Sequence, residues 1–310
     1  MHQIHATVAR ELELVNQLIV EQLHSHVEMV ENIGHYIVDA GGKRLRPLLV
    51  LLSAAALGRS DAAHITFATA IEYNHTATLL HDDVVDISSL RRGRPTANAE
   101  YGNAPSVLVG DFLYTRAFQL MVRLGDMDIL SHMAATTNII AEGEVVQLTR
   151  AGDASMNETQ YLDVITRKTA ILFAAACYGA ATLSGEEEET RNTLREFGLN
   201  LGIAFQMIDD VLDYDGNAAT MGKNVGDDLM EGKVTLPLIH TLLQGNAAER
   251  AAVRRAIIEK NSTQIEQITA AVRRCGALDY TRARAKHYHD MALEKLMLLP
   301  ASNARSALER

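Results

Sequence analysis

Residues 106–124 read SVLVGDFLYTRAFQLMVRL, and their apolar side chains recur at intervals of three and four positions. Leu108, Phe112, Leu120 and Met121 belong to this pattern. Such intervals place side chains on one face of an α-helix, whereas a half-buried strand would alternate at every second residue. This stretch therefore predicts a helix.

The same helical pattern extends outward over most of the chain. No proline occurs between Pro105 and Pro237, and proline is the residue that most strongly interrupts helices. No stretch shows convincing alternation with a period of two. We therefore predict an all-α fold. Comparable helical periodicity covers residues 7–38, 62–87, 128–149, 158–183, 190–213 and 250–275.

Short segments that contain glycine or proline are expected to connect these helices. None of them is long enough or biased enough in composition to be an interdomain linker. We therefore expect residues 1–310 to form a single domain, built as one helical bundle. The expected connections are 41–47, 91–95, 101–105, 123–126, 150–155, 183–189, 215–228 and 242–246.

The composition narrows the class of protein. A net charge of −10 argues against a nucleic-acid partner, because phosphate backbones require a cationic face. No apolar run approaches the roughly 18 to 20 residues that cross a membrane, and the first thirty residues show no secretory signal. Cys177 and Cys275 are far apart, which fits reduced thiols. We therefore expect a cytoplasmic protein.

Two acidic motifs of the form DDxxD follow apolar helical runs, in LLHDDVVDISSLRRGRPTAN (79–98) and FQMIDDVLDYDG (205–216). On a helix this spacing projects the three carboxylates of each motif from one face, where they repel one another unless a cation lies among them. One such cluster could be a solvated face, but two copies favour a site for Mg²⁺ or Mn²⁺. The candidate metal ligands are Asp82, Asp83, Asp86, Asp209, Asp210 and Asp213.

Basic and polar residues recur near both motifs, and they fit a phosphorylated substrate. Magnesium usually binds through one or two carboxylates together with substrate phosphates. The glycine-led turn GGKRLRP (41–47) clusters donors that can hold a diphosphate. Taken singly, each of these residues is best explained as a surface residue, and only their recurrence favours a site. They are Lys43, Arg44, Arg46, Arg91, Arg92, Lys168, Thr169, Gln206, Lys223 and Lys233.

These motifs, in this order, carry a family resemblance. The chain contains GGKRLRP, HTATLLHDDVVD (75–86), RRGRPTAN (91–98), RKTA (167–170), the second acidic motif and GKNVGDDLMEGK (222–233). With them it resembles the trans-type polyprenyl diphosphate synthases from about residue 10 to about residue 300. The resemblance implies the isoprenoid synthase fold, an antiparallel helical bundle around a central cavity. Within that bundle, the resemblance implies that the two acidic helices face each other across the cavity. It also implies a homodimer.

The resemblance assigns roles to the candidate residues. It implies that Asp82, Asp83, Asp86, Asp209, Asp210 and Lys168 take part in catalysis, with Asp213 in support of the metal site. The residues implied to bind isopentenyl diphosphate are Lys43, Arg46, His75 and Arg92, while Arg44 in the same turn has no certain role. The residues implied to bind the allylic diphosphate are Arg91, Lys168, Thr169, Gln206, Lys223 and Lys233.

The implied reaction is the Mg²⁺-dependent head-to-tail condensation of isopentenyl diphosphate with an allylic diphosphate such as farnesyl diphosphate. Small residues at Ala77 and Thr78, before the first acidic motif, leave room for a deep product tunnel, whose floor Phe118 and Met121 could form. Taken by themselves, Phe118 and Met121 are better explained as ordinary core residues. We expect a long-chain product, with eight isoprene units as the best single value, for quinone side chains.

Other interpretations remain open at this stage. A shorter-chain synthase, giving geranylgeranyl or hexaprenyl diphosphate, would share the same motifs. A terpene cyclase also uses aspartate-rich helices, but it has no need of a second diphosphate pocket. A non-catalytic subunit of a heteromeric synthase is expected to lose some acidic or basic residues, and none is missing here. No basic amphipathic helix indicates an anchor, so membrane contact would be transient at most.

Overall fold

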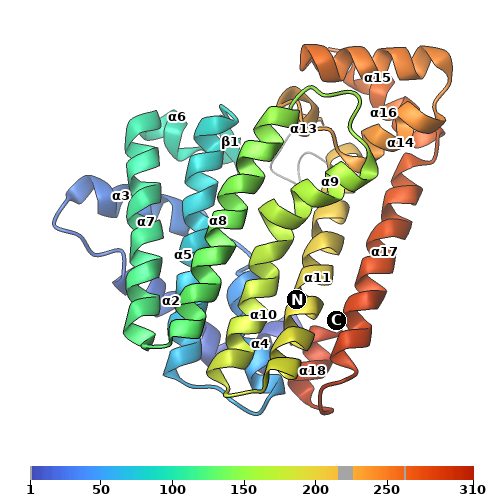
Figure 1. The fold of residues 1–310 in the computed structure, drawn as a ribbon. Coiled ribbons are helices and arrows are strands. Elements are labelled where there is room, and N and C mark those ends of the chain that lie inside the picture. Colours follow the sequence, from blue (N-terminus) through green and yellow to red (C-terminus); the bar gives the residue numbers. More distant parts are fainter. Residues whose placement is uncertain (1, 216–225, 262) are drawn as a thin grey trace. The chain divides into compact units, whose positions relative to one another are not determined.

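The computed structural model describes residues 2–215, 226–261 and 263–310. Over these residues the prediction of an all-α fold is confirmed, apart from one very short hairpin (Figure 1). The elements are α1 (His2–Thr7), α2 (Ala9–Glu21), α3 (Glu28–Asp39), α4 (Leu45–Ala56), α5 (Ala62–Val85), β1 (Leu90–Arg91), β2 (Arg94–Pro95), α6 (Ala97–Tyr101), α7 (Asn103–Leu124), α8 (Met127–Arg150), α9 (Glu158–Ile165), the π-helix η1 (Thr166–Ala170), α10 (Ile171–Leu183), α11 (Glu188–Asp215), α13 (Asp227–Met230), α14 (Leu236–Gln244), α15 (Ala247–Glu259), α16 (Ile265–Arg274), α17 (Ala277–Leu296) and α18 (Asn303–Leu308).

The expected connection at 91–95 is a β-hairpin. Strands β1 and β2 are antiparallel, with Leu90 opposite Pro95. The two loop residues, Arg92 and Gly93, both have positive φ angles, of 54° and 74°. Positive φ at both central residues is the geometry of a type I′ turn, which matches the twist of a tight hairpin. Strands of two residues are too short to produce a period-two pattern, so the sequence does not reveal them.

Two of the expected long helices are interrupted. Residues 7–38 fold as α2 and α3, and residues 250–275 fold as α15 and α16. In the first break the Glu31 carboxylate accepts the backbone N–H of Ser25 at 2.8 Å, which satisfies that donor outside a helix. Helices α4, α14 and α17 lie largely outside the stretches where we expect helices.

The described residues form two compact units. Unit 1 comprises Met1–Thr136, Leu172–Gly198 and Leu293–Arg310, and unit 2 comprises Thr137–Ile171 and Leu199–Ala292. The prediction of a single domain stays a prediction.

In unit 1, α5 packs side by side with α7 and against α4 (Figure 1). Phe67, Ile71 and Leu80 of α5 are fully buried in this core. A glycine permits the closest approach, because a Cβ atom at Gly110 of α7 would lie 2.4 Å from Nε2 of His81. The C-terminal end of α5, which carries the first acidic motif, is therefore held firmly against α7.

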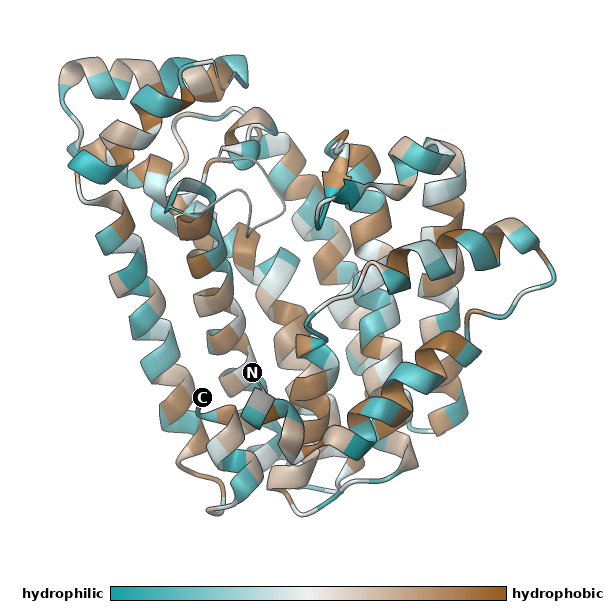
Figure 2. Ribbon diagram, turned by 180° about the vertical axis from the view of Figure 1, so that it is seen from behind, coloured by the Kyte–Doolittle hydropathy of each residue, from teal (hydrophilic) through white to brown (hydrophobic). Residues whose placement is uncertain are grey.

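In unit 2, α11 packs into a separate core. Met207 and Val211 of α11 are buried together with residues of α14, α15 and α16. Figure 2 shows apolar and polar positions interleaved along the helices, so that each helix has an apolar side to bury. This packing fixes the helix that carries the second acidic motif.

One segment, Glu158–Leu183, is long and apolar enough to cross a membrane by length and composition alone. However, 72% of its most apolar window is buried inside the protein. Such burial is typical of the core helix of a globular protein, and one such segment is weak evidence for a membrane span.

Candidate active site

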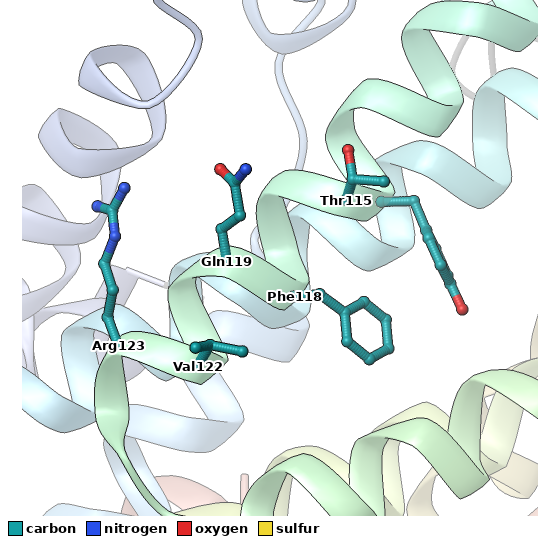
Figure 3. Close-up of a pocket in the computed structure, with 6 residues that line it drawn as sticks. Thr115, Phe118, Gln119, Val122 and Arg123 are labelled. Atoms are coloured by element: carbon teal, nitrogen blue, oxygen red, sulfur yellow. The ribbon is translucent and has the colours of Figure 1, made fainter.

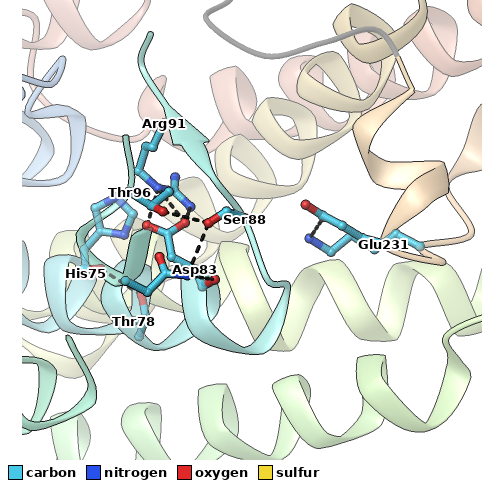
Figure 4. A network of polar contacts seen from close by, with 9 residues as sticks. His75, Thr78, Asp83, Ser88, Arg91, Thr96 and Glu231 are labelled. Atoms are coloured by element: carbon cyan, nitrogen blue, oxygen red, sulfur yellow. Dashed lines mark hydrogen bonds and ion pairs between the residues drawn. The ribbon is translucent and has the colours of Figure 1, made fainter. Parts of the chain in front are cut away.

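The first acidic motif lies at the C-terminal end of α5, and its three aspartates differ in their surroundings. Asp83 is only 1% exposed, whereas Asp82 and Asp86 are half-buried. Arg91 of the hairpin donates to Asp83 through Nε at 3.0 Å to both carboxylate oxygens and through a terminal nitrogen at 2.7 Å (Figure 4). Arg91, which we expect to bind the allylic diphosphate, is thus anchored to the first motif.

The loop between α5 and the hairpin is fixed by its own hydrogen bonds. The backbone N–H of Ser88 donates to the Asp83 carbonyl at 2.9 Å, and the Thr96 hydroxyl donates to the Ser88 carbonyl at 2.7 Å. Asn98 donates to the carbonyls of both Asp83 and Ser88 at 3.2 Å. The position of Arg91 relative to α5 therefore depends on several hydrogen bonds within the loop and not only on its contact with Asp83.

Four arginines gather around the buried His75 next to this motif, and we call them, together with His75, the arginine cluster: Arg44, Arg46, Arg91, Arg92 and His75. Burial, and then the neighbouring guanidinium groups, lower the pKa of His75 well below its ordinary value. Burial also lowers the pKa of Arg46 to about 10, and this guanidinium lies 4.6 Å from the ring centre of Phe173. Lys43 is exposed on the adjoining turn. The structure thus brings three of the predicted isopentenyl diphosphate residues, Arg46, His75 and Arg92, near one another, and the role of Lys43 stays a prediction.

The glycine-led turn approaches this cluster closely. At Gly42, where φ is 157°, a Cβ atom would lie 3.0 Å from a terminal nitrogen of Arg92. Arg44, at the N-cap of α4, has a φ of 47° and donates at 2.7 Å to Glu72. Glu72 is a functional candidate that the sequence analysis missed. Its position three residues before His75, on the same helix face, is the signal that could have indicated it.

In unit 2 the three aspartates of the second acidic motif also differ in their exposure to solvent. Asp210 is 2% exposed and Asp213 is buried, whereas Asp209 is exposed. Asp210 accepts two hydrogen bonds, from the Tyr161 hydroxyl at 2.6 Å and from Nε2 of Gln206 at 2.9 Å. Burial, and then the nearby Asp228 carboxylate, raise the pKa of Asp210 to about 8, although both hydrogen bonds oppose this shift. Tyr161 is a second residue that the sequence analysis missed.

The π-helix η1 presents the predicted Lys168 and Thr169. The Thr169 hydroxyl donates to Oε1 of Gln206 at 2.9 Å, and Lys168 Nζ donates to Glu144 of α8 at 2.7 Å. A Cβ atom at Gly143 would lie 2.7 Å from Cβ of Arg167, so α8 packs very closely against η1. A π-turn inside a helix often marks a functional site, because the extra residue changes which side chains share a face.

Of the two remaining predicted lysines, the structure describes Lys233 but not Lys223. Lys233 forms an ion pair with Glu231 in the segment after α13 (Figure 4). Lys223 lies outside the described residues, so its predicted role stays a prediction. Glu231 and Glu144 were also missed by the sequence analysis, since single glutamates carry no spacing signal.

The predicted chain-length residues lie in unit 1. Ala77 is buried and Thr78 is half-buried on α5, and Met121 is fully buried on α7. Phe118 lines an open hollow on α7 together with Tyr114, Thr115, Gln119, Val122 and Arg123 (Figure 3). Their role in product length stays a prediction.

The donor set fits a hard divalent cation that shares its coordination with a ligand. Within the described residues, no three His, Cys, Asp or Glu side chains form a metal site by themselves. The half-buried Asp82 and Asp86 and the exposed Asp209 offer carboxylate oxygens, which are the donors that Mg²⁺ prefers. Magnesium commonly uses one or two protein carboxylates and completes its shell with water and substrate phosphate.

Comparisons with known proteins identify the family of this chain. A family model described as polyprenyl synthetase matches residues 27–275. Octaprenyl diphosphate synthase of Escherichia coli (strain K12) is 47% identical over 309 residues, covering 99% of this chain and 96% of the relative. An all-trans-nonaprenyl-diphosphate synthase (geranyl-diphosphate specific) of Rhodobacter capsulatus is 48% identical, covering 98% of this chain and 94% of the relative.

A solved structure extends the likeness to three dimensions. The polyprenyl synthase from Caulobacter crescentus CB15, complexed with calcium and isoprenyl diphosphate, superposes with a TM-score of 0.96 at 42% identity. The match covers 99% of this chain and 94% of that one. The chain therefore belongs to the polyprenyl synthetase family and is a prenyltransferase.

Proposed function

We propose that this long-chain trans-prenyltransferase joins isopentenyl diphosphate head-to-tail to an allylic diphosphate such as farnesyl diphosphate. The observation that carries the proposal is the pairing of the arginine cluster with the first acidic motif. Arg91 belongs to both, because it is bound to Asp83 and lies beside His75. In this proposal the two diphosphates bind next to each other near the C-terminal part of α5, as a reaction between two diphosphate esters requires.

Isopentenyl diphosphate is held in this proposal by Lys43, Arg46, His75 and Arg92. The closeness of Arg92 to Gly42 and the lowered pKa values of Arg46 and His75 support it. A lowered pKa reports that positive charge is costly at this place while no anion is bound. A diphosphate would relieve that cost, and charge-assisted hydrogen bonds from arginine fix its orientation.

The allylic diphosphate is held in this proposal by both acidic motifs through Mg²⁺, or Mn²⁺, and by basic and polar side chains. When bound, the metal supplies charge that stabilises the departing diphosphate. The carboxylates proposed for the metal are Asp82, Asp83, Asp86, Asp209, Asp210 and Asp213. Those proposed to surround the diphosphate are Arg91, Lys168, Thr169, Gln206, Lys223 and Lys233.

The chain's own residues contribute electrostatics and shelter from water. Arginine and lysine groups fixed before the reaction stabilise the negative charge that develops on the leaving diphosphate. Buried apolar side chains such as Ala77 and Leu80 exclude water, which would otherwise capture the allylic cation. The final proton goes to the released diphosphate in this proposal, so no histidine or glutamate base is needed.

We propose octaprenyl diphosphate as the main product, for quinone side chains. In this proposal the small side chains of Ala77 and Thr78 leave room for a product tunnel beyond the first motif, which favours a long chain. The identity to an octaprenyl synthase, 47%, and to a nonaprenyl synthase, 48%, is nearly equal, so identity alone does not separate the two lengths. The alternatives are a shorter-chain synthase and a non-catalytic subunit of a heteromeric synthase.

We also propose that the protein is a cytoplasmic homodimer with at most transient membrane contact. Leu108 and Val122 of α7 are 65% and 60% exposed, and this apolar face suits a second copy of the chain. Light scattering coupled to size-exclusion chromatography tests the dimer, and a monomer would overturn it.

The decisive experiment for the reaction uses purified protein, Mg²⁺, farnesyl diphosphate and labelled isopentenyl diphosphate. The products are dephosphorylated and separated by chain length. Octaprenol as the main product supports the proposal, and shorter products support the short-chain alternative. The absence of any elongation would overturn the proposal that this chain alone is a complete enzyme.

A further inference from the structure

Four side chains of unit 2 form a continuous line of hydrogen bonds. Thr169 of η1 donates to Gln206 at 2.9 Å, and Gln206 donates to Asp210 at 2.9 Å. Tyr161 of α9 donates to the other oxygen of Asp210 at 2.6 Å. Both donors point their hydrogens toward Asp210, so the carboxylate is held from two sides by neutral groups.

This line of bonds joins two elements at two points each. Tyr161 and Thr169 are eight residues apart on the continuous helical segment that contains η1, whereas Gln206 and Asp210 are four residues apart on α11. The π-helix η1 begins between the first two and contains Thr169, so this stretch does not have the fixed geometry of a regular α-helix. Tyr161 therefore contacts α11 from the segment before η1, whereas Thr169 contacts it from within η1.

The hydrogen bond from Tyr161 affects the second acidic motif because Asp210 is the middle aspartate of that motif. Asp210 is 2% exposed and its neighbour Asp209 is exposed. The two are consecutive residues of α11, so the hydrogen bond from Tyr161 holds the helix directly beside Asp209. Groups that hydrogen-bond to ligand carboxylates fix their orientation, and the loss of such a group commonly weakens metal binding.

We propose that Tyr161 is a positioning residue for the allylic diphosphate site, acting through Asp210 and Gln206. It holds the second acidic motif in register with Lys168 and Thr169, and it does not touch the substrate itself. The inference rests on the proposed function, since it concerns the diphosphate and metal that this site would take.

The test is the variant Tyr161→Phe, which removes one hydroxyl and keeps the ring. We expect the KM for farnesyl diphosphate to rise by about tenfold or more, because loss of an outer hydrogen-bond partner typically costs that much. The KM for isopentenyl diphosphate should stay within about twofold, since its proposed residues belong to other elements. A titration with Mn²⁺ in the presence of inorganic diphosphate, followed by electron paramagnetic resonance, should show a similar loss of affinity.

Tyr280→Phe is the matched control. The Tyr280 hydroxyl donates to the carboxylate of Glu158 at 2.6 Å in the same unit, so this variant deletes a tyrosine hydroxyl with the same hydrogen-bond length whose acceptor lies outside the acidic motif. We expect this variant to leave both KM values and Mn²⁺ binding within about twofold of the wild type. Unfolding midpoints of both variants show how much of any change reflects general loosening.

The outcomes separate the inference from the proposed function. If the wild type elongates farnesyl diphosphate and Tyr161→Phe leaves its KM and Mn²⁺ binding unchanged, the inference is wrong and the function stands. Equal rises in both KM values, or the same change in Tyr280→Phe, would also overturn it. A wild type that makes no prenyl product overturns the function instead. If Tyr161→Phe unfolds, the Mn²⁺ titration at low temperature, where the folded fraction is restored, decides the question.

Discussion

The middle aspartates of the two motifs, Asp83 and Asp210, are buried, and side chains of the protein hydrogen-bond to both. The outer members of the first motif, Asp82 and Asp86, are half-buried. The spacing DDxxD predicts only the directions of the side chains around a helix. It does not predict which residues pack against them. The spacing therefore predicts six candidate carboxylates without ranking their burial, while the structure distinguishes the buried Asp83, Asp210 and Asp213 from the more exposed Asp82, Asp86 and Asp209.

At the same scale, Glu72 explains how the arginine cluster is tolerated without a ligand. Its carboxylate is buried on α5 and pairs with Arg44, which also donates to the Val38 carbonyl at 3.3 Å. One buried negative charge among several cations reduces their mutual repulsion. Arg44 is thus engaged by the protein, which accounts for its uncertain role among the residues of the glycine-led turn.

His75 gives a pH dependence that can be measured. Burial and the nearby guanidinium groups lower its pKa, so between that lowered value and about 6.5 the unfolded chain binds more protons than the folded one. Stability from neutral His75 is present above about pH 6.5 and is lost as pH falls through that value. We expect His75→Gln to lose this part of the dependence.

Urea unfolding of the unliganded protein, from about pH 8 down to about pH 5.5, measures this effect. His26→Gln, at an exposed histidine, is the control and should keep the slope of the wild type. Parallel curves for the wild type and His75→Gln would show that His75 does not titrate in this way.

At the scale of elements, α8 and η1 approach so closely that a single methyl group should disturb the site. A Cβ at Gly143 would lie 2.7 Å from Cβ of Arg167 and 3.1 Å from the backbone nitrogen of Lys168. We expect Gly143→Ala to displace η1 and to lower kcat/KM for the allylic substrate by about tenfold or more, because small misplacements of positioning groups are costly. Steady-state kinetics with each substrate varied in turn measures this.

Gly179→Ala is a matched control for overlap alone. A Cβ there would lie 2.2 Å from the buried ring of Phe67, in the core of unit 1. It should lower the unfolding midpoint without a selective change in the allylic KM. If Gly143→Ala behaves in the same way, η1 does not depend on this contact for its function.

Helix α5 carries the prediction for product length. Ala77 is buried about one turn before the first acidic motif. We expect Ala77→Phe to give shorter products, by about one isoprene unit for each turn of tunnel wall that the ring closes. Chromatography of the dephosphorylated products measures their length, with Ala62→Phe at the exposed start of α5 as the control. An unchanged product length would remove α5 from the tunnel wall.

At the scale of the whole molecule, the two cysteines report on global opening. Burial raises the pKa of the Cys177 thiol to about 12, so almost none of it is thiolate at neutral pH. Both cysteines are free, and Cys275 is half-buried. In the variant Cys275→Ser, we expect the remaining thiol to react with a disulfide reagent only as fast as the protein unfolds. Rapid labelling in native buffer would mean that α10 opens locally.

The sequence by itself determined the helical class, the positions of the two acidic motifs and the basic residues that accompany them. These features are local, because a 3.6-residue period and a DDxxD spacing are properties of one helix. Its helix boundaries were less accurate at 22–27, where side-chain contacts override the period, and between α15 and α16.

Only the tertiary structure decided which side chains pair with one another. It paired Arg91 with Asp83, Arg44 with Glu72 and Tyr161 with Asp210, across separations in sequence of 8, 28 and 49 residues. Buried polar groups must find partners, but the partner depends on what packs beside them in space. A linear pattern carries no record of that neighbour, so these pairs could not be predicted from spacing.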